Sequence, residues 1–187
     1  MPPKIKITKE SIVKVAIDMV RSQGASALNA RNLAQALGCS TQPIFSNFDS
    51  MGDLKGAVVK EAERIYQAYS DTLVSQSEFP TYKASGMAYI RFAKEERELF
   101  CLLYMRNRSD EVIPKETDLG NQMNTLVQNN TGLCEDVAKL FHLEMWAYVH
   151  GIASMIATGY LDLDEALISN MLTHAFQGLK HAFSADV

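Results

Sequence analysis

Apolar residues recur at spacings of three and four along almost the whole chain, which is the period of amphipathic helices. The clearest early stripe consists of Ile12, Val13, Ala16, Ile17 and Val20. No segment shows the alternation of apolar and polar residues typical of half-buried strands, and no Asn-Gly or Asp-Gly pair marks a tight hairpin. The 187 residues are therefore predicted to fold as an all-α chain of about nine helices.

Capping residues and helix breakers indicate where these helices end. Thr8 and Gly24 bound the first helix, Ser50 opens the long fourth helix, and Ser40 and Asp162 are the expected caps of the third and last helices. The signals predict helices over 8–23, 30–37, 41–47, 50–75, 80–93, 95–106, 114–129, 134–159 and 162–182. The eighth of these is apolar on nearly every side, so we expect it to be covered on all faces.

Charge is divided unevenly along the chain. The whole chain carries a net charge of −4, from 18 Lys and Arg against 22 Asp and Glu. Residues 1–60 hold eight basic and four acidic side chains, a net charge of +4, whereas residues 61–187 hold ten basic and eighteen acidic ones. A basic first third joined to an acidic remainder predicts two regions with different partners, and only the first suits nucleic acid.

The basic region contains residues at the spacing of a helix-turn-helix unit. Such a unit needs a small residue where its two helices cross, a glycine at the turn, and an apolar residue on the second helix. Ala34, Gly38 and Ile44 supply these at steps of four and six. We therefore predict that the helix over 41–47 enters the major groove of DNA by its N-terminal half.

These motifs carry a family resemblance. Residues 29–40, followed by Ile44, Phe45 and Leu54, resemble the DNA-binding domain of the tetracycline-repressor (TetR) family, and the resemblance covers about residues 8–60. The later helices are similar in number and length to that family's second domain, and Trp146 to Gly151 resembles a Trp-x-x-x-His-Gly signature of one subgroup. The resemblance implies a DNA-binding domain over 1–52 and a ligand-binding and dimerisation domain over 53–187.

The resemblance also implies which residues touch DNA. Glutamine and asparagine bond adenine edges, proline and threonine methylenes contact thymine methyls, and basic residues bind phosphate. The sequence departs from the family pattern at Phe45, often a tyrosine, and at Met51, often a lysine, for which Lys55 is a substitute one turn later. The expected contacts are Arg31, Ser40, Thr41, Gln42, Pro43, Phe45, Ser46, Asn47 and Lys55.

The acidic region is expected to hold a small molecule. Eight residues combine large apolar faces with a few hydrogen-bonding tips, as small-molecule sites do. They are Tyr66, Tyr89, Phe92, Phe100, Tyr104, Met123, Trp146 and His150. The alternative is that most of them belong to the core of the bundle. His142, Trp146 and His150 share a helix face, but no third ligand stands at helical spacing, so we expect no metal and no cofactor.

Small residues late in the eighth predicted helix permit close approach of another helix. Together with the last helix they are candidates for a four-helix interface across a two-fold axis. The candidates are Ala153, Ala157, Leu167, Met171 and Ala175. Packing within one chain is the alternative, but a single helix-turn-helix unit reads too few base pairs to be specific, which favours a homodimer.

These observations lead to one functional hypothesis and one alternative. The hypothesis is a dimeric, ligand-responsive transcriptional repressor that binds a palindromic double-stranded DNA operator, with DNA affinity changed by a small-molecule effector. The alternative is a TetR-like interaction protein that acts as a coregulator without DNA. The sequence has no phosphate loop, nucleophile elbow or paired catalytic carboxylates, so we expect no enzyme. We expect a cytoplasmic protein without a membrane anchor, because no signal peptide or membrane-spanning run is evident.

Overall fold

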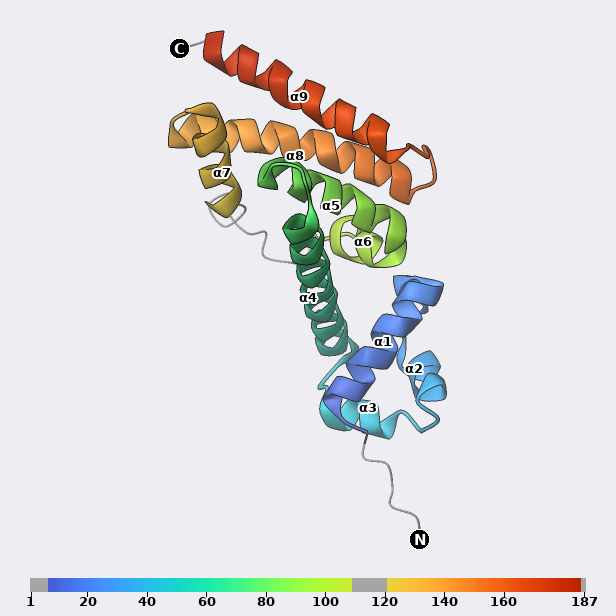
Figure 1. Cartoon of the computed structure of the whole chain (residues 1–187). Coiled ribbons are helices and arrows are strands. Elements are labelled where there is room, and N and C mark those ends of the chain that lie inside the picture. Colours follow the sequence, from blue (N-terminus) through green and yellow to red (C-terminus); the bar gives the residue numbers. More distant parts are fainter. Residues whose placement is uncertain (1–6, 109–120, 186–187) are drawn as a thin grey trace. The chain divides into compact units, whose positions relative to one another are not determined.

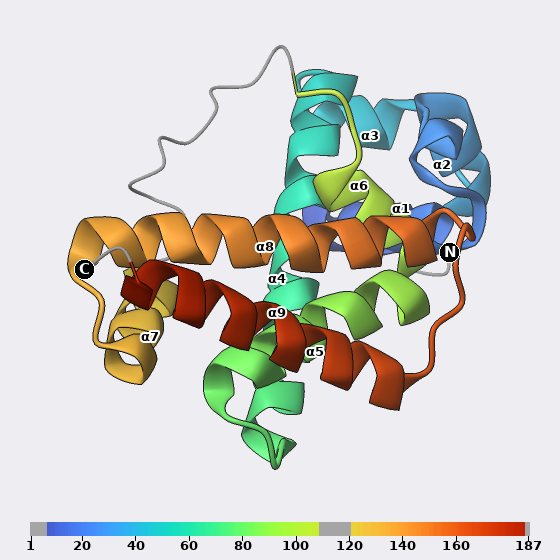
Figure 2. The same cartoon turned by 90° about the horizontal axis from the view of Figure 1, so that it is seen from above.

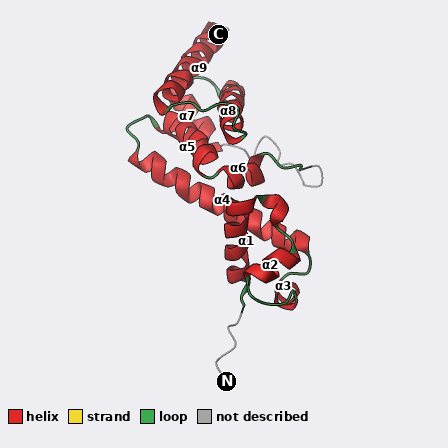
Figure 3. Ribbon diagram, turned by 90° about the vertical axis from the view of Figure 1, so that its right-hand side faces the viewer, coloured by secondary structure: helices red, strands yellow, loops and turns green. Residues whose placement is uncertain are grey.

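The computed structural model describes residues 7–108 and 121–185, and these contain nine α-helices, one short 3-10 turn and no strand (Figure 1, Figure 3). The predicted all-α fold is therefore confirmed. The predicted start of the seventh helix near residue 114 lies outside the described residues. The helices are α1 (Lys9–Gln23), α2 (Ala30–Ala36), α3 (Gln42–Asn47), α4 (Met51–Gln76), α5 (Thr81–Glu95), α6 (Arg97–Tyr104), α7 (Asn121–Thr131), α8 (Glu135–Ala157) and α9 (Glu165–Ala185).

Local capping fixes the ends of the first helices as predicted. The Thr8 side chain accepts a hydrogen bond from the Ser11 backbone N–H at 3.2 Å, and the Ser11 hydroxyl oxygen accepts one from the Thr8 N–H at 3.0 Å. Asn29 caps α2 by accepting from the Asn32 N–H at 2.9 Å, and Ser50 caps α4 by accepting from the Asp53 N–H at 3.1 Å. Each bond satisfies a donor that the first helical turn leaves without a partner.

Two predicted caps are wrong. The third helix starts one residue later than expected, so that Thr41, not Ser40, occupies its N-cap, and no side chain caps it. The last helix is capped by Asp164, whose carboxylate accepts from the Leu167 N–H at 2.7 Å. Asp162 lies two residues before this cap position, and its carboxylate instead accepts a hydrogen bond from Lys94 Nζ at 2.6 Å.

The chain divides into two compact units, and α4 contributes to both. Unit 1 comprises Met1–Ala68 and Glu96–Arg106, and unit 2 comprises Tyr69–Glu95 and Asn107–Val187. The division separates α1, α2, α3 and α6 from α5, α7, α8 and α9. The predicted domain boundary between residues 52 and 53 concerns function and stays a prediction.

Each unit has its own apolar core. In unit 1 the core side chains of α1, α2, α3, α4 and α6 are fully buried, among them Ile12, Leu33, Ile44, Leu54 and Phe100. In unit 2, α5 packs closely on α8 and α9, and α8 and α9 run side by side (Figure 2). A Cβ on Gly86 of α5 would lie 3.3 Å from Leu172, so glycine permits this close packing.

One side of α8 is left uncovered by the other helices that the structure describes. Leu140, Leu143, Trp146 and Tyr148 are exposed, with 51% of the Leu143 surface accessible. The expectation that this helix is covered on all faces is therefore wrong for a single chain, because α5, α7 and α9 cover only part of its circumference. Among the described helices, none is both long and apolar enough to cross a membrane.

Candidate nucleic-acid interface

The turn between α2 and α3 has the geometry that its three marker residues predict. Gly38 adopts φ +65°, a left-handed conformation that costs glycine little because it has no Cβ. The Cys39 N–H donates to the Ala34 carbonyl at 3.0 Å, which reverses the chain directly after α2. Ala34 and Ile44 are both buried, and α2 and α3 each pack on α1, as expected for a helix-turn-helix unit.

One side of α3 is exposed and carries several of the predicted contact residues. Thr41, Gln42, Phe45 and Ser46 are exposed, and the last three share a face at positions i, i+3 and i+4. Phe45 is 49% exposed, which is a large accessible surface for an aromatic side chain. The Ser46 hydroxyl donates to the Gln42 backbone carbonyl at 2.9 Å, and the Gln42 side chain is exposed.

The remaining predicted contacts differ in their freedom to reach DNA. Asn47 is half-buried, and its side-chain amide donates to the Pro43 carbonyl at 2.8 Å, which commits that donor to the end of α3. Arg31 at the start of α2 and Lys55 in α4 are exposed, as is Ser40, whereas Met51 is half-buried. Arg31 and Lys55 are thus accessible to DNA, whereas the Asn47 side-chain amide is hydrogen-bonded within α3.

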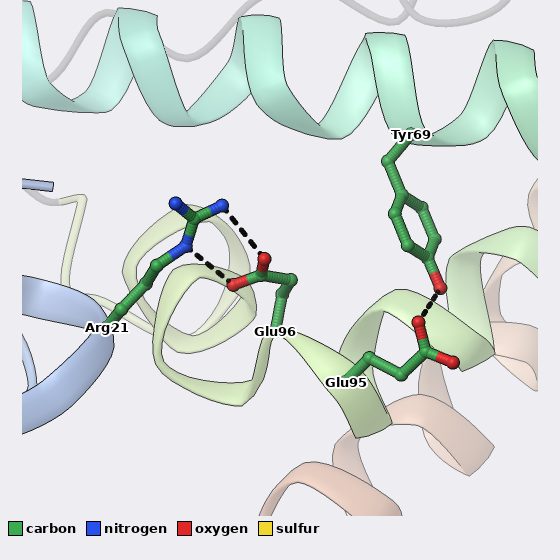
Figure 4. A network of polar contacts seen from close by, with 4 residues as sticks. All are labelled: Arg21, Tyr69, Glu95 and Glu96. Atoms are coloured by element: carbon green, nitrogen blue, oxygen red, sulfur yellow. Dashed lines mark hydrogen bonds and ion pairs between the residues drawn. The ribbon is translucent and has the colours of Figure 1, made fainter. Parts of the chain in front are cut away.

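A bidentate ion pair joins α1 to the start of α6 within unit 1. The Arg21 Nε and Nη2 donate to the two carboxylate oxygens of Glu96 at 2.9 Å and 2.8 Å (Figure 4). Gly24, which ends α1 at φ +78°, lies so close to α6 that an added Cβ would be 2.9 Å from Glu98 Oε2. No local sequence signal predicts this contact, because Arg21 and Glu96 are 75 residues apart.

The predicted ligand residues fall into two groups. Tyr66, Phe100 and Tyr104 form an aromatic cluster in unit 1, with ring centroids 5.9 Å and 5.1 Å apart for the Tyr66–Tyr104 and Phe100–Tyr104 pairs. Unit 2 holds the other five, of which Tyr89 and Phe92 are buried, Met123 and His150 are half-buried, and Trp146 is 43% exposed. Three of these five residues are in contact, because His150 hydrogen-bonds Tyr89 and stacks on Trp146.

Two tyrosines of α5 hydrogen-bond two histidines of α8. The Tyr89 hydroxyl lies 2.9 Å from His150 Nδ1, and the Tyr82 hydroxyl lies 3.0 Å from His142 Nδ1. The Trp146 ring stacks on the His150 ring, with centroids 5.0 Å apart and planes 11° apart. Burial lowers the pKa of both histidines and raises the pKa of Tyr82, so burial favours the neutral form of both imidazoles and of the Tyr82 hydroxyl.

Just over half of the chain matches a known family. Residues 82–177 fit the family model described as "Tetracyclin repressor-like, C-terminal domain". The chain belongs to the TetR family. The matched residues include most of α5, all of α6, α7 and α8, and part of α9. The helix-turn-helix unit precedes them, so the family assignment does not depend on the DNA-binding motif.

Solved structures agree with the fold of this TetR-family chain. A TetR-like transcriptional regulator from Rhodococcus sp. RHA1 is 13% identical, with a TM-score of 0.68 over 96% of this chain and 98% of that chain. A Rhodococcus sp. RHA1 protein of unknown function is 21% identical, with a TM-score of 0.73 over 97% and 98%. The multidrug binding protein EbrR, solved in complex with imidazole, is 17% identical, with a TM-score of 0.63 over 89% and 88%. No curated protein matches this chain.

The predicted dimer residues of this TetR-family chain are unequally accessible. Ala153 and Ala157 are 0% and 1% exposed, because the chain's own helices already cover them. Met171 and Ala175 are half-buried, and Ala175 packs against the cluster of Val127, Ala138, Phe141 and Met145. Leu167 is exposed. The accessible apolar surface is therefore provided by Leu167 and by the uncovered side of α8.

A polar groove lies between α1 and α4 in unit 1 of this TetR-family chain. It encloses about 1230 Å³, and its lining includes equal numbers of basic and acidic side chains. Glycines of α4, Gly52 and Gly56, leave room for it, and Val13 and Ile17 of α1 line it as well. None of the eight predicted ligand residues lines this groove, whose mixed charge differs from the apolar lining typical of small-molecule sites.

Proposed function

We propose that this TetR-family chain is a dimeric transcriptional repressor that binds a palindromic operator through α3 and responds to a small molecule. The observation that carries the proposal is the exposed polar side of α3 on a helix-turn-helix unit. Exposed polar side chains at the N-terminal half of such a helix are suited to contact base edges in the major groove. The local charge of the first 60 residues, +4, supports the same partner.

The proposed contacts divide into base readers and phosphate binders. Gln42 bonds an adenine edge, and Phe45 and Pro43 contact thymine methyl groups or sugars. The exposed Phe45 ring thus has an apolar partner on DNA. Arg31 and Lys55 bind phosphates, together with the hydroxyls of Ser40, Thr41 and Ser46. Asn47 orders the end of α3, because its side-chain amide donates to the Pro43 carbonyl at 2.8 Å and to the Ile7 carbonyl at 3.5 Å, which leaves its side-chain oxygen for DNA.

We propose that the homodimer forms through the uncovered side of α8 and the neighbouring surface of α9. Leu140, Leu143 and Leu167 are large apolar residues with no covering partner among the described residues of the chain. Several exposed large apolar side chains on two neighbouring helices are typical of an interaction site. Ala153, Ala157 and Ala175 support this interface from within by allowing α8 and α9 to pack closely, and Met171 lies at its edge.

The effector site is proposed to lie in unit 2. Tyr89, Phe92, Met123 and His150 supply apolar faces and hydrogen-bonding groups, with Trp146 at the outer end of the Tyr89–His150 pair. A solved structure with a similar fold belongs to a protein named for multidrug binding, which supports a small-molecule role for the fold. Ligand binding that favours one of two conformations changes DNA affinity, and the coupling is reciprocal.

The experiment is selection of DNA sites from a random pool with the purified full-length protein, followed by titration at several salt concentrations. We expect a palindromic site to be enriched. Arg31 and Lys55 of two subunits make four phosphate contacts, so log K should fall against log salt with a slope steeper than about −3. The double variant Arg31→Gln, Lys55→Gln should reduce that slope, whereas Lys94→Gln, an exposed lysine of α5 in unit 2, serves as the matched control.

The second candidate function is a coregulator that binds a protein and not DNA. The exposed Phe45 ring on α3 and the uncharged Met51 at the start of α4 favour it, because both reduce polar contact with a phosphate backbone. If no sequence is enriched at low salt, and a stoichiometric protein partner is retained that Phe45→Ala releases, the coregulator function replaces the DNA-binding one.

A further inference from the structure

One buried polar side chain in unit 2 has no hydrogen-bond partner for its acceptor. Asn124 of α7 is 7% exposed, and it is the one polar side chain among the described residues to be buried to this degree. Its Oδ1 atom is fully buried and accepts no hydrogen bond from the described part of the chain. Buried acceptors without partners are rare and costly, so each calls for a physical reason.

The position of Asn124 explains why no other side chain satisfies it. It lies one helical turn before Val127, so both residues face the same side of α7, where α7 packs on α8. Val127 belongs to the buried cluster with Ala138, Phe141 and Met145, and these side chains offer no hydrogen-bond donor suited to an amide oxygen. The amide therefore stands at the edge of an apolar core.

The hydroxyl of Tyr82, which packs on that core, already has a hydrogen-bond partner. That partner is His142, whose Nδ1 atom lies 3.0 Å from the hydroxyl oxygen. An acceptor left over in such surroundings is suited to a donor that arrives from outside the chain.

We propose that Asn124 Oδ1 is the hydrogen-bond acceptor for the effector, and that the effector is a neutral, mainly apolar molecule with one hydroxyl or N–H donor. This inference rests on the ligand response proposed above and assigns its polar anchor. An amide oxygen accepts and does not donate, so a ligand presenting only acceptors gains nothing there.

The charges of unit 2 explain why the ligand is neutral. Every acidic residue of unit 2 within the described ranges is exposed, including Glu135, Asp136 and Glu144 of α8. A ligand ammonium buried beside Asn124 would therefore find no buried carboxylate among them to compensate its charge, which disfavours cations. A hydroxyl or neutral N–H needs only the one acceptor that Asn124 supplies.

The test measures binding of two probes, phenol and toluene, to the full-length dimer by isothermal titration calorimetry. The probes have nearly the same shape, but only phenol carries a donor. We expect Asn124→Leu, which has similar volume and no acceptor, to weaken phenol binding about tenfold and leave toluene binding unchanged. Asn129→Leu, an exposed position on the same helix, is the matched control and should change neither affinity.

Thermal unfolding of the free protein provides a second readout. Replacing an unpaired buried acceptor by an apolar side chain should leave Tm unchanged or raise it. A clear decrease in Tm for Asn124→Leu means that the amide is satisfied within the fold, which overturns the proposal. Equal losses for phenol and toluene, an unchanged phenol affinity, or no phenol binding to the wild-type protein also overturn it.

DNA binding separates this inference from the proposed function. If the wild-type protein and Asn124→Leu both bind the selected DNA site while the variant keeps its phenol affinity, only the assignment of Asn124 fails. If the wild-type protein binds no DNA, the proposed function fails whatever the probe affinities are.

Discussion

The two units of the molecule present contrasting surfaces. Eight of the ten large hydrophobic side chains that are exposed in the described residues lie in unit 2, whereas unit 1 has Phe45 and Met105. Unit 1 instead presents hydroxyl, amide and basic groups around α3. A polar, locally basic surface suits a polyanion, and an apolar helix face suits another apolar surface. Net charge must therefore be assessed by region. The acidic residues after position 60 outweigh the +4 of the first 60 residues, so the net charge of the whole chain is −4.

The largest effect is expected from a charge placed on the apolar face of α8. Leu143→Glu should separate the dimer and reduce operator affinity by about 100-fold or more, because the two half-sites are then no longer bound by a linked pair. Sedimentation and DNA titration measure the two effects. Phe79→Glu adds the same charge at another exposed hydrophobic position of unit 2 and should leave both unchanged. A dimer that survives Leu143→Glu contradicts the proposed interface.

The next effect concerns the polar surface of unit 1. Gln42→Ala removes the proposed base contact and should cost about 10- to 100-fold in affinity, with relaxed preference at one base pair of each half-site. Gln23→Ala, exposed at the end of α1, controls for loss of a glutamine elsewhere in the same unit. Unchanged affinity and sequence preference for Gln42→Ala would remove this residue from the readout.

The ion pair between α1 and α6 gives a smaller effect on stability. Both side chains of the Arg21–Glu96 pair are partly exposed, so the pair contributes at most about 1 kcal/mol, and Arg21→Gln or Glu96→Gln should lower Tm by about 2–4 °C. The double variant should cost little more than either single one, because both singles remove the same interaction. Additive losses in this cycle would show that the two residues act separately.

The histidines of unit 2 give the smallest effect. Burial lowers the folded pKa of His142 and His150 below their usual 6.5, so the unfolded chain takes up protons first as pH falls. Their contribution to stability is complete above about pH 6.5 and is lost as pH falls through the folded pKa. Thermal unfolding across this range should show a decline in Tm that His142→Gln makes less steep, whereas the exposed His181→Gln leaves it as it is. An identical decline in both variants would contradict this account.

Local sequence signals predicted much of unit 1. Thr8, Asn29 and Gly38 act within a few residues of their own position, so their roles are readable from the sequence and are seen in the structure. The cap of α9 was misplaced because Asp162 and Asp164 are both suitable residue types, and only the structure shows which one faces the Leu167 N–H. The inward-turned Asn47 amide was missed for the same reason, since its type alone suggests a base contact.

Features that depend on distant partners were not predictable. The Arg21–Glu96 pair joins residues far apart in the sequence, and neither carries a local motif. Helical periodicity showed that α8 is apolar on most sides, but it does not say which side another helix covers. For that reason Ala153 was expected at the outer surface and is buried, whereas Trp146 was expected in a pocket and is exposed. Asn124 carried no signal, because its meaning comes from the apolar side chains around it.

The most direct test of the central claim inserts about five base pairs, half a helical turn, between the two halves of the selected palindrome. Two reading units held by one dimer cannot then face the same side of the DNA. We predict that affinity falls by about 100-fold, while each half-site alone retains only weak binding. If the protein binds the lengthened site as tightly as the original, or occupies it as one chain, the account of a dimer reading two half-sites is contradicted.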